Sequence, residues 1–251
     1  PRVTNSTFMS VNGLQGQGFN GSGVPLEWLV SLSNTVSAHP WLCMPHAADD
    51  DFVRQCATLV KSQLDPSLDV YVEYSNEVHN AGFAVYDYAA TRGLELGLAT
   101  DEKTARHRYQ ALRSTQMFAI WRNVFGADSL RVKRILAVGD GRDAGLSVTY
   151  GDTRTQIDAL AMHTYFGVGL GGDLTSPISQ YTPDDIFDTL EQEIDASYRS
   201  KIAYLSGRAE LLDIPLICYE GGQHLSTYAD DLSHLSAQDM QDFRELMWSC
   251  N

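Results

Sequence analysis

Short runs of alternating apolar residues follow one another along the chain, separated by longer runs whose apolar residues recur at helical spacing. The order strand, helix, strand repeated from residue 24 onward is typical of a parallel sheet whose strands are joined by crossover helices. We predict strands at residues 38–46, 68–75, 132–139, 157–166 and 214–220, and helices at 25–36, 49–64, 83–97, 101–125, 183–212 and 237–248.

The 251 residues suit one large domain, since α/β barrels commonly use about 250 residues. No internal repeat and no linker divides the chain. Residues 1–23 are rich in Gly, Ser and Asn and predict an irregular N-terminal segment with at most a short strand at 7–11. We therefore expect an α/β fold of the (β/α)8 TIM-barrel type, formed by a single domain over residues 1–251.

Charge and hydropathy exclude some partners. The net charge of −14 repels phosphate backbones, so we expect no nucleic-acid partner. No apolar run approaches the roughly 18 residues that span a bilayer, so we expect no membrane partner. The sequons at Asn5 and Asn20 favour an extracellular or secretory location. The sequence has four cysteines, Cys43, Cys56, Cys218 and Cys250, and no two of them form a C-x-x-C motif. They are either free thiols or disulfide-bonded.

Polar side chains stand where the predicted strands end, which is where βα folds carry their chemistry. The segment "YVEYSNEVHN" places Asn76 and Glu77 directly after a strand, and "ICYEGGQH" places Glu220 at the end of another. Two carboxyl groups brought together in this way can cleave a glycosidic bond. Further candidates that would line a sugar site at these ends are Trp41, His46, His79, His163, Tyr165 and His224.

"VEYSNEVHN" followed about 140 residues later by "ICYEGGQH" resembles the glycoside hydrolases of clan A, a large (β/α)8 superfamily. The resemblance covers roughly residues 24–224. It implies that Asn76 and Glu77 end strand 4 of the barrel with Glu77 as acid/base, and that Glu220 ends strand 7 as nucleophile. "HTY" at residues 163–165 matches the His-x-Tyr of strand 6. The resemblance implies a retaining mechanism on a β-glycosidic bond, without naming the sugar.

Two departures from the family pattern bear on these expectations. His79 stands where related sequences usually have Trp, which indicates lost packing, another sugar contact or a surface change. Strands 1 and 8 of the barrel are not evident in the sequence. Either the chain is a fragment, or residues 1–23 and the C-terminus close the barrel unusually, or a partner chain completes it.

The expected reaction is hydrolysis of a β-glycosidic bond in an oligo- or polysaccharide, with no cofactor. Asn76 would bind the sugar 2-hydroxyl, Tyr165 would orient Glu220, and His163 and His46 would line the site. In a retaining enzyme the two catalytic carboxyl groups lie about 5–5.5 Å apart.

Other functions remain open at this point. A non-catalytic glycan-binding or structural module would keep the barrel and lose hydrolysis. A metal-dependent hydrolase has weaker support, because "HPWLCMPH" lacks helical ligand spacing and no H-E-x-x-H occurs; we expect no metal. "GVGLGG" at 167–172 follows a strand, but Pro177 blocks an immediate helix, which favours a loop over a nucleotide site.

Overall fold

The computed structural model describes residues 24–139, 143–167, 170–225 and 232–250. The predictions made for residues 1–23, namely the short strand at 7–11 and the two sequons, lie outside the described residues. Within those that are described, no helix is both long enough and apolar enough to cross a membrane.

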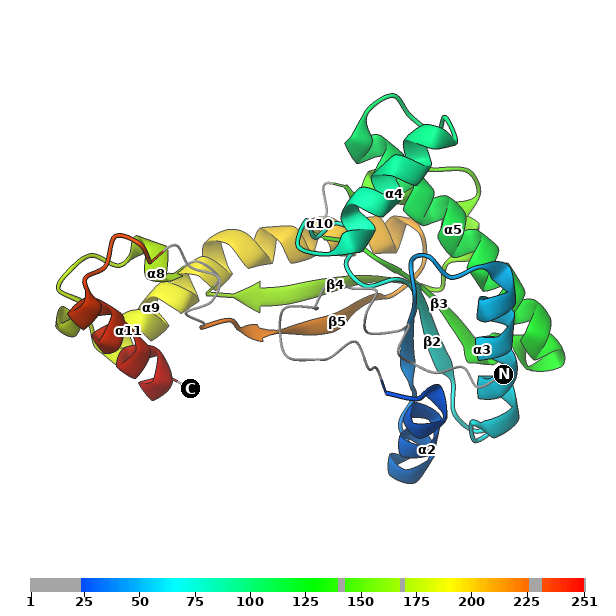
Figure 1. Ribbon diagram of the computed structural model, residues 1–251, viewed down its shortest axis with the longest axis horizontal. Helices are drawn as coiled ribbons and strands as arrows, with labels where there is room; N and C mark the ends of the chain where they lie inside the picture. The colour runs from blue at the N-terminus through cyan, green and yellow to red at the C-terminus, as the bar shows by residue number, and fades with distance from the viewer. Residues whose placement is uncertain (1–23, 140–142, 168–169, 226–231, 251) are drawn as a thin grey trace. The chain divides into compact units, whose positions relative to one another are not determined.

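A parallel sheet organises the described residues (Figure 1). It contains five strands in the order β1-β2-β3-β4-β5, which is also their order along the chain. The pairs β1-β2, β2-β3 and β3-β4 are parallel. The α/β class and the parallel sheet expected from the sequence are therefore confirmed. The strands are β1 Trp41–Met44, β2 Val70–Tyr74, β3 Val132–Ala137, β4 Ala159–Phe166 and β5 Leu216–Gln223.

Two backbone hydrogen bonds show that β5 runs parallel to β4. Leu160 N–H donates to Pro215 O at 3.1 Å, and His224 N–H donates to Phe166 O at 2.7 Å. Residue numbers rise together on both strands, as a parallel pairing requires. All five strands therefore have the same direction.

Helices connect successive strands, as the sequence pattern predicts. α3 begins after Asp49, whose side chain accepts a hydrogen bond from Phe52 N–H at 2.8 Å. Asp101 caps α5 in the same way through Thr104 N–H at 2.9 Å. The α-helices are α2 Leu26–Val36, α3 Asp50–Gln63, α4 Ala84–Glu95, α5 Glu102–Phe125, α6 Ala144–Val148, α7 Thr153–Gln156, α8 Leu170–Asp173, α9 Pro183–Glu193, α10 Arg199–Leu211 and α11 Ala237–Ser249.

The helices and strands predicted from the sequence lie in the right places, but several of their first or last residues are wrong. The predicted strand at 38–46 is only Trp41–Met44, because Pro40 and Pro45 flank it. β5 continues past Glu220 to Gln223, so Glu220 lies inside the strand rather than at its end. The predicted helix at 183–212 is divided by a π-helical turn at Ile194–Tyr198. The glycine-rich loop predicted at 167–172 contains the start of the short helix α8.

The chain divides into two compact units, and the boundary passes through β4 and β5. Unit 1 comprises residues up to 162 together with 208–217, and unit 2 comprises 163–207 with 218–251. The expectation of a single domain stays a prediction. The structure has the four cysteines as thiols and not as disulfides, which are the two alternatives left open by the sequence.

The core of unit 1 lies between the sheet and α5 (Figure 1). Val70, Val72 and Tyr74 are all buried, as their alternation predicts. The Tyr74 ring meets Tyr109 of α5 edge-on at 6.2 Å. α3 and α4 pack against α5 as well, which explains why buried residues occur on several sides of this helix.

An ion-pair cluster holds the amino-terminal ends of β3 and β4 together. Asp158 Oδ2 accepts hydrogen bonds from Arg134 N–H at 2.8 Å and from its Nε at 2.9 Å. Asp158 Oδ1 accepts from Arg134 Nη2 at 2.8 Å, and Arg122 adds a longer contact at 3.3 Å. Burial raises the pKa of Asp158, but the hydrogen bonds and charge of Arg134 outweigh it, so the pKa is lowered overall.

Unit 2 has its own apolar core, built on α9, α11 and the segment that precedes α9. Its fully or nearly fully buried members include Ile178, Ile186, Leu190 and Phe243. Asp239 in the first turn of α11 ties this core to the segment before α9. Its carboxylate accepts hydrogen bonds from Ile178 N–H at 2.9 Å and from the hydroxyls of Ser176 and Ser236 at 2.8 and 2.7 Å.

We predict that unit 2 loses stability when Asp239 is protonated. The hydrogen bond from Ile178 N–H and those from Ser236 and Ser176 lower the pKa of Asp239 from 3.8 to about 2. Because the folded pKa lies below the unfolded one, this stabilisation is complete above roughly pH 4 and disappears as the pH falls towards 2. Asp239→Asn should lower the free energy of urea unfolding at pH 7 and flatten its decline between roughly pH 4 and 2.

The matched control is Glu245→Gln, which changes an exposed carboxylate on the same helix. It should leave both the stability at pH 7 and the pH dependence nearly unchanged. Equal behaviour of the two variants would contradict the assignment of the acid-sensitive stability to Asp239.

Candidate active site

The chain makes an unusual turn directly after β2. Ser75 N–H continues the parallel ladder by donating to Met44 O at 2.7 Å. Ser75 and Glu77 then both adopt left-handed backbone conformations, with φ of 57° and 46°. Asn80 N–H closes the turn onto Glu77 O at 2.8 Å. Non-glycine residues in this conformation are strained, and such strain concentrates at functional sites.

Glu77 is buried, with 8% of its surface exposed. Its Oε2 accepts a hydrogen bond from Asn80 Nδ2 at 2.8 Å. Its Oε1 lies 3.9 Å from His79 Nε2, which is too long for a direct hydrogen bond. The amide of Asn80 is oriented in turn, because its Oδ1 accepts Gly82 N–H at 2.9 Å. The acid/base candidate is therefore a carboxyl group with one oxygen held by an oriented amide.

The imidazole of His79 lies against the backbone of Gly139, just past the end of β3. A Cβ added to Gly139 would stand 2.7 Å from His79 Cδ2 and 2.8 Å from Cγ. Only glycine allows this approach, and the His79 side chain is 18% exposed as a result. His79 thus occupies a defined position between Gly139 and the Glu77 carboxyl group.

His79 also lines a polar cleft of about 540 Å³. The other walls come from α4, α5 and the segment before α6, and include Tyr86, Lys103, Arg106, His107 and Asp143. Arg106 stacks on the Tyr86 ring at 3.3 Å, and Lys103 pairs with Asp143 at 2.6 Å. The cleft therefore has both charged and aromatic side chains in its walls. It lies beside the turn formed by residues 75–80, which we call the Glu77 turn.

His107, at the wall of this cleft, belongs to a buried polar network. Its Nε2 lies 3.4 Å from Asp143, and its Nδ1 lies 3.4 Å from the Ser147 hydroxyl. Ser147 is fully buried and donates to Gln110 Oε1 at 3.0 Å, so this Ser-His-Asp arrangement is structural. Burial lowers the pKa of His107, although Asp143 opposes the shift.

Trp41 and His46 are predicted site residues at β1, and both have protein contacts. Trp41 stacks on Tyr71 with ring centroids 5.6 Å apart, and its Nε1 donates to Glu73 Oε2 at 2.9 Å. The His46 ring lies 4.7 Å from that of Tyr88. Asn76, half-buried, lies in the bend after β2. Their roles towards a sugar stay predictions.

Glu73 is a carboxylate that the sequence reasoning missed. It is 2% exposed and is held by Trp41 Nε1 and, more weakly, by Cys43 Sγ at 3.5 Å. The only local signal was its place in "VYVEY", where alternation puts it on the face opposite Val72 and Tyr74. Since Cys43 is its register partner on β1, the pairing became visible only in the folded sheet. Asn80 was missed because its contact with Glu77 depends on the turn after β2.

The remaining predicted residues lie in unit 2, where three of them form an aromatic row. His163 lies 5.9 Å from Tyr165, and Tyr165 meets His224 edge-on at 5.4 Å. Tyr219 joins the row, with its ring 6.1 Å from that of His163. His163 and Tyr165 lie in the carboxyl-terminal half of β4, Tyr219 lies in the middle of β5, and His224 directly follows β5.

Glu220 is half-buried within β5, next to two glycines. A Cβ at Gly221 would stand 2.1 Å from Thr164 Oγ1, so glycine lets β5 lie close to β4 there. Gly222 has a φ of 119°, which disfavours any side chain. The two predicted catalytic glutamates thus belong to different units, Glu77 to unit 1 and Glu220 to unit 2. Their separation of about 5–5.5 Å stays a prediction.

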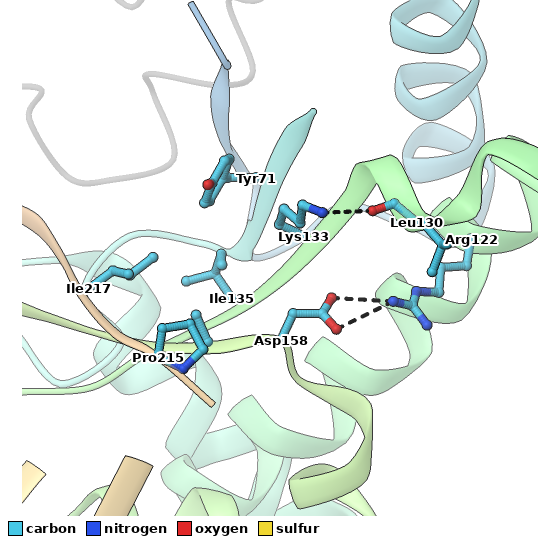
Figure 2. A pocket seen from close by; sticks show the side chains of 9 residues that line it. Tyr71, Arg122, Leu130, Lys133, Ile135, Asp158, Pro215 and Ile217 are labelled. Atoms are coloured by element: carbon cyan, nitrogen blue, oxygen red, sulfur yellow. Dashed lines mark hydrogen bonds and ion pairs between the residues drawn. The ribbon is translucent and has the colours of Figure 1, made fainter. Parts of the chain in front are cut away.

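A second cavity lies at the opposite ends of the strands (Figure 2). It has a volume of about 470 Å³, and its lining includes Tyr71 near the start of β2, Ile135 within β3, and Pro215 and Ile217 around the start of β5. The Arg122–Asp158 ion pair borders it. None of the residues predicted for the site lines this cavity, which separates it from the strand ends that carry Glu77.

Comparison of the chain with family models, curated proteins and solved structures yields no match. The likeness to clan A glycoside hydrolases therefore rests on the motifs quoted above.

We predict that Gly139→Ala displaces the His79 ring. The added Cβ would overlap the imidazole, and the side chain must swing away from the Glu77 turn. We expect an altered NMR chemical shift of the His79 ring carbons and a loss of about 1–3 kcal/mol in unfolding free energy from overpacking.

Gly145→Ala provides the matched control, because a Cβ there meets only Arg208 Nη2 at 3.9 Å. It should change neither the His79 signals nor the stability by a comparable amount. An unchanged His79 spectrum in Gly139→Ala would contradict the packing described.

Proposed function

We propose that the protein is a retaining glycoside hydrolase that cleaves β-glycosidic bonds of an oligo- or polysaccharide. The observation that carries the proposal is the Glu77 turn: a buried carboxyl group on strained backbone, past the carboxyl end of a parallel strand, oriented by a neighbouring amide. Parallel α/β folds place their reactive groups at this end of the strands. The resemblance of the Glu77 and Glu220 motifs to clan A supports the same function.

In the first step a Glu220 oxygen attacks the anomeric carbon while Glu77 gives its proton to the leaving oxygen. The glycosidic C–O bond breaks, the leaving group departs as an alcohol, and a glycosyl ester forms on Glu220. In the second step Glu77, now a carboxylate, takes a proton from water. The water oxygen attacks the same carbon, and the ester bond to Glu220 breaks.

The other candidate residues serve binding and orientation in this proposal. Asn76 binds the sugar 2-hydroxyl, Tyr165 orients Glu220, and His46 and His163 line the site. His79, His224 and Trp41 complete the sugar-binding surface. We assign the reaction to an extracellular setting because of the two sequons, Asn5 and Asn20.

We expect Glu220→Gln to abolish turnover of an activated aryl β-glycoside, because an amide cannot form the glycosyl ester. Glu77→Gln should lower turnover of a substrate with a poor leaving group by about 10²–10⁴-fold, the usual contribution of acid/base catalysis. Initial rates on a panel of aryl β-glycosides measure both effects, and circular dichroism confirms the fold.

The control is Glu193→Gln in unit 2, where the carboxylate accepts Gly167 N–H at 2.8 Å and the amide oxygen can replace it. Its rates should match the wild type. Unchanged turnover in Glu220→Gln would remove that residue from the nucleophile role.

A glycan-binding module is the second candidate, favoured by the presence of five strands, rather than the eight of a closed barrel, in the described part of the chain. A glycan array combined with a hydrolysis screen separates the two functions. Binding to a glycan that the protein does not cleave would favour the binding module.

A further inference from the structure

We propose that Asn80 is a positioning residue that makes Oε1 of Glu77 the oxygen through which the proton is transferred. The inference rests on the proposed function of Glu77 as acid/base. It gives a role to a residue to which the resemblance assigns none, and it assigns distinct tasks to the two oxygens of the carboxyl group.

Two hydrogen bonds define the orientation of the Asn80 amide. Its Oδ1 accepts Gly82 N–H at 2.9 Å, so the oxygen side of the amide is identified by a backbone donor. Its Nδ2 must then be the atom that lies 2.8 Å from Glu77 Oε2. An amide nitrogen carries only donors, so Glu77 Oε2 is the acceptor in this contact.

In the protonated form of Glu77 the two carboxyl oxygens are not equivalent. A proton on Oε2 would point at the N–H donor of Asn80, leaving two donors facing each other in a buried place. A proton on Oε1 leaves Oε2 as a carbonyl oxygen that still accepts from Asn80. The carboxylate form of Glu77 keeps the Asn80 hydrogen bond in any case. The acid form keeps it when the proton is on Oε1.

Oε1 of Glu77 lies on the side of His79. It is the oxygen nearer to His79, at 3.9 Å from Nε2, and His79 lines the polar cleft. The leaving oxygen of the substrate must approach Oε1 to within hydrogen-bond distance in the first step, and water must do so in the second. One oxygen serves both proton transfers, while the other is anchored throughout the cycle.

The backbone explains why this anchor lies so close in sequence. The turn from Glu77 to Asn80 is closed by Asn80 N–H on Glu77 O at 2.8 Å, which brings residue 80 beside the Glu77 side chain. The left-handed conformation of Glu77 is part of the same turn. The strained backbone thereby contributes to the direction of the carboxyl group.

The test uses Asn80→Asp in the full chain. The substitution keeps an acceptor for Gly82 N–H and the size of the side chain, but replaces the donor facing Oε2 with an acceptor. A proton would then be shared between the introduced carboxylate and Glu77 Oε2, and withheld from Oε1. Wild type and variant are compared on 2,4-dinitrophenyl and phenyl β-glycosides of the sugar that the wild type cleaves best.

We expect kcat/KM to fall by about 10²-fold for the phenyl glycoside, whose poor leaving group needs the proton, because small misplacements of a catalytic group have effects of this size. For the dinitrophenyl glycoside, which leaves without a proton, kcat/KM should change little. Damage to the fold would lower both rates together. Equal losses on the two substrates would overturn the positioning role.

Asn34→Asp is the matched control. Like Asn80, the Asn34 side chain donates through Nδ2 and accepts a backbone N–H through Oδ1, although its acceptor is a backbone oxygen. It donates to Gln63 O at 2.8 Å and accepts from Asp65 N–H at 2.9 Å, far from the Glu77 turn in the sequence. The same chemical change there should leave the ratio of the two rates at the wild-type value. A ratio altered as much as in Asn80→Asp would also overturn the inference.

A second readout does not depend on hydrolysis. The side-chain amide protons of Asn80, observed by NMR, should shift markedly in Glu77→Ala, because this substitution removes the oxygen that accepts the hydrogen bond from Asn80 Nδ2. If the Asn80 signals do not change, the hydrogen bond from Asn80 to Glu77 is not present in solution. A wild type that cleaves no glycoside would overturn the proposed function and the proton transfer with it, whereas the NMR result would still decide whether Asn80 holds Glu77.

Discussion

Backbone hydrogen bonding between parallel strands underlies every other feature of this fold. It joins five separate segments into one sheet in which all strands run in the same direction. The bond from Ser75 N–H to Met44 O extends this ladder one residue past β2. Glu77 is placed just beyond the last regular pairing, where the chain is free to adopt a strained turn.

The carboxyl groups at the two ends of the strands have different hydrogen-bond partners. At the amino-terminal ends, Asp158 is saturated by the backbone and guanidinium of Arg134, and its lowered pKa reflects a structural ion pair. Past the carboxyl end of β2, Glu77 has an oriented amide on one oxygen and a histidine at longer range from the other. The first arrangement stabilises the sheet, and the second is the one on which the proposed acid/base role of Glu77 rests.

Glycine residues allow the close approaches that shape both candidate regions. Gly139 admits the His79 ring beside the Glu77 turn, and Gly221 admits the Thr164 side chain beside Glu220. In each case a side chain occupies the space in which a Cβ would stand. The replacement of the expected Trp by His79 is thus accompanied by a specific packing contact, which argues against a surface change at this position.

The α/β class, the approximate places of the five strands and the position of Glu77 after a strand follow from the amino-acid sequence alone, because alternation and helical spacing depend on neighbours along the chain. Folding was needed to place Glu220 inside β5, to bring Trp41 onto Glu73, and to set Gly139 against His79. The partners in the last two cases are separated by 32 and 60 positions in the sequence, and no local pattern encodes such contacts. The anchor from Asn80 is near in sequence, but it depends on the left-handed turn that the folded chain adopts after β2.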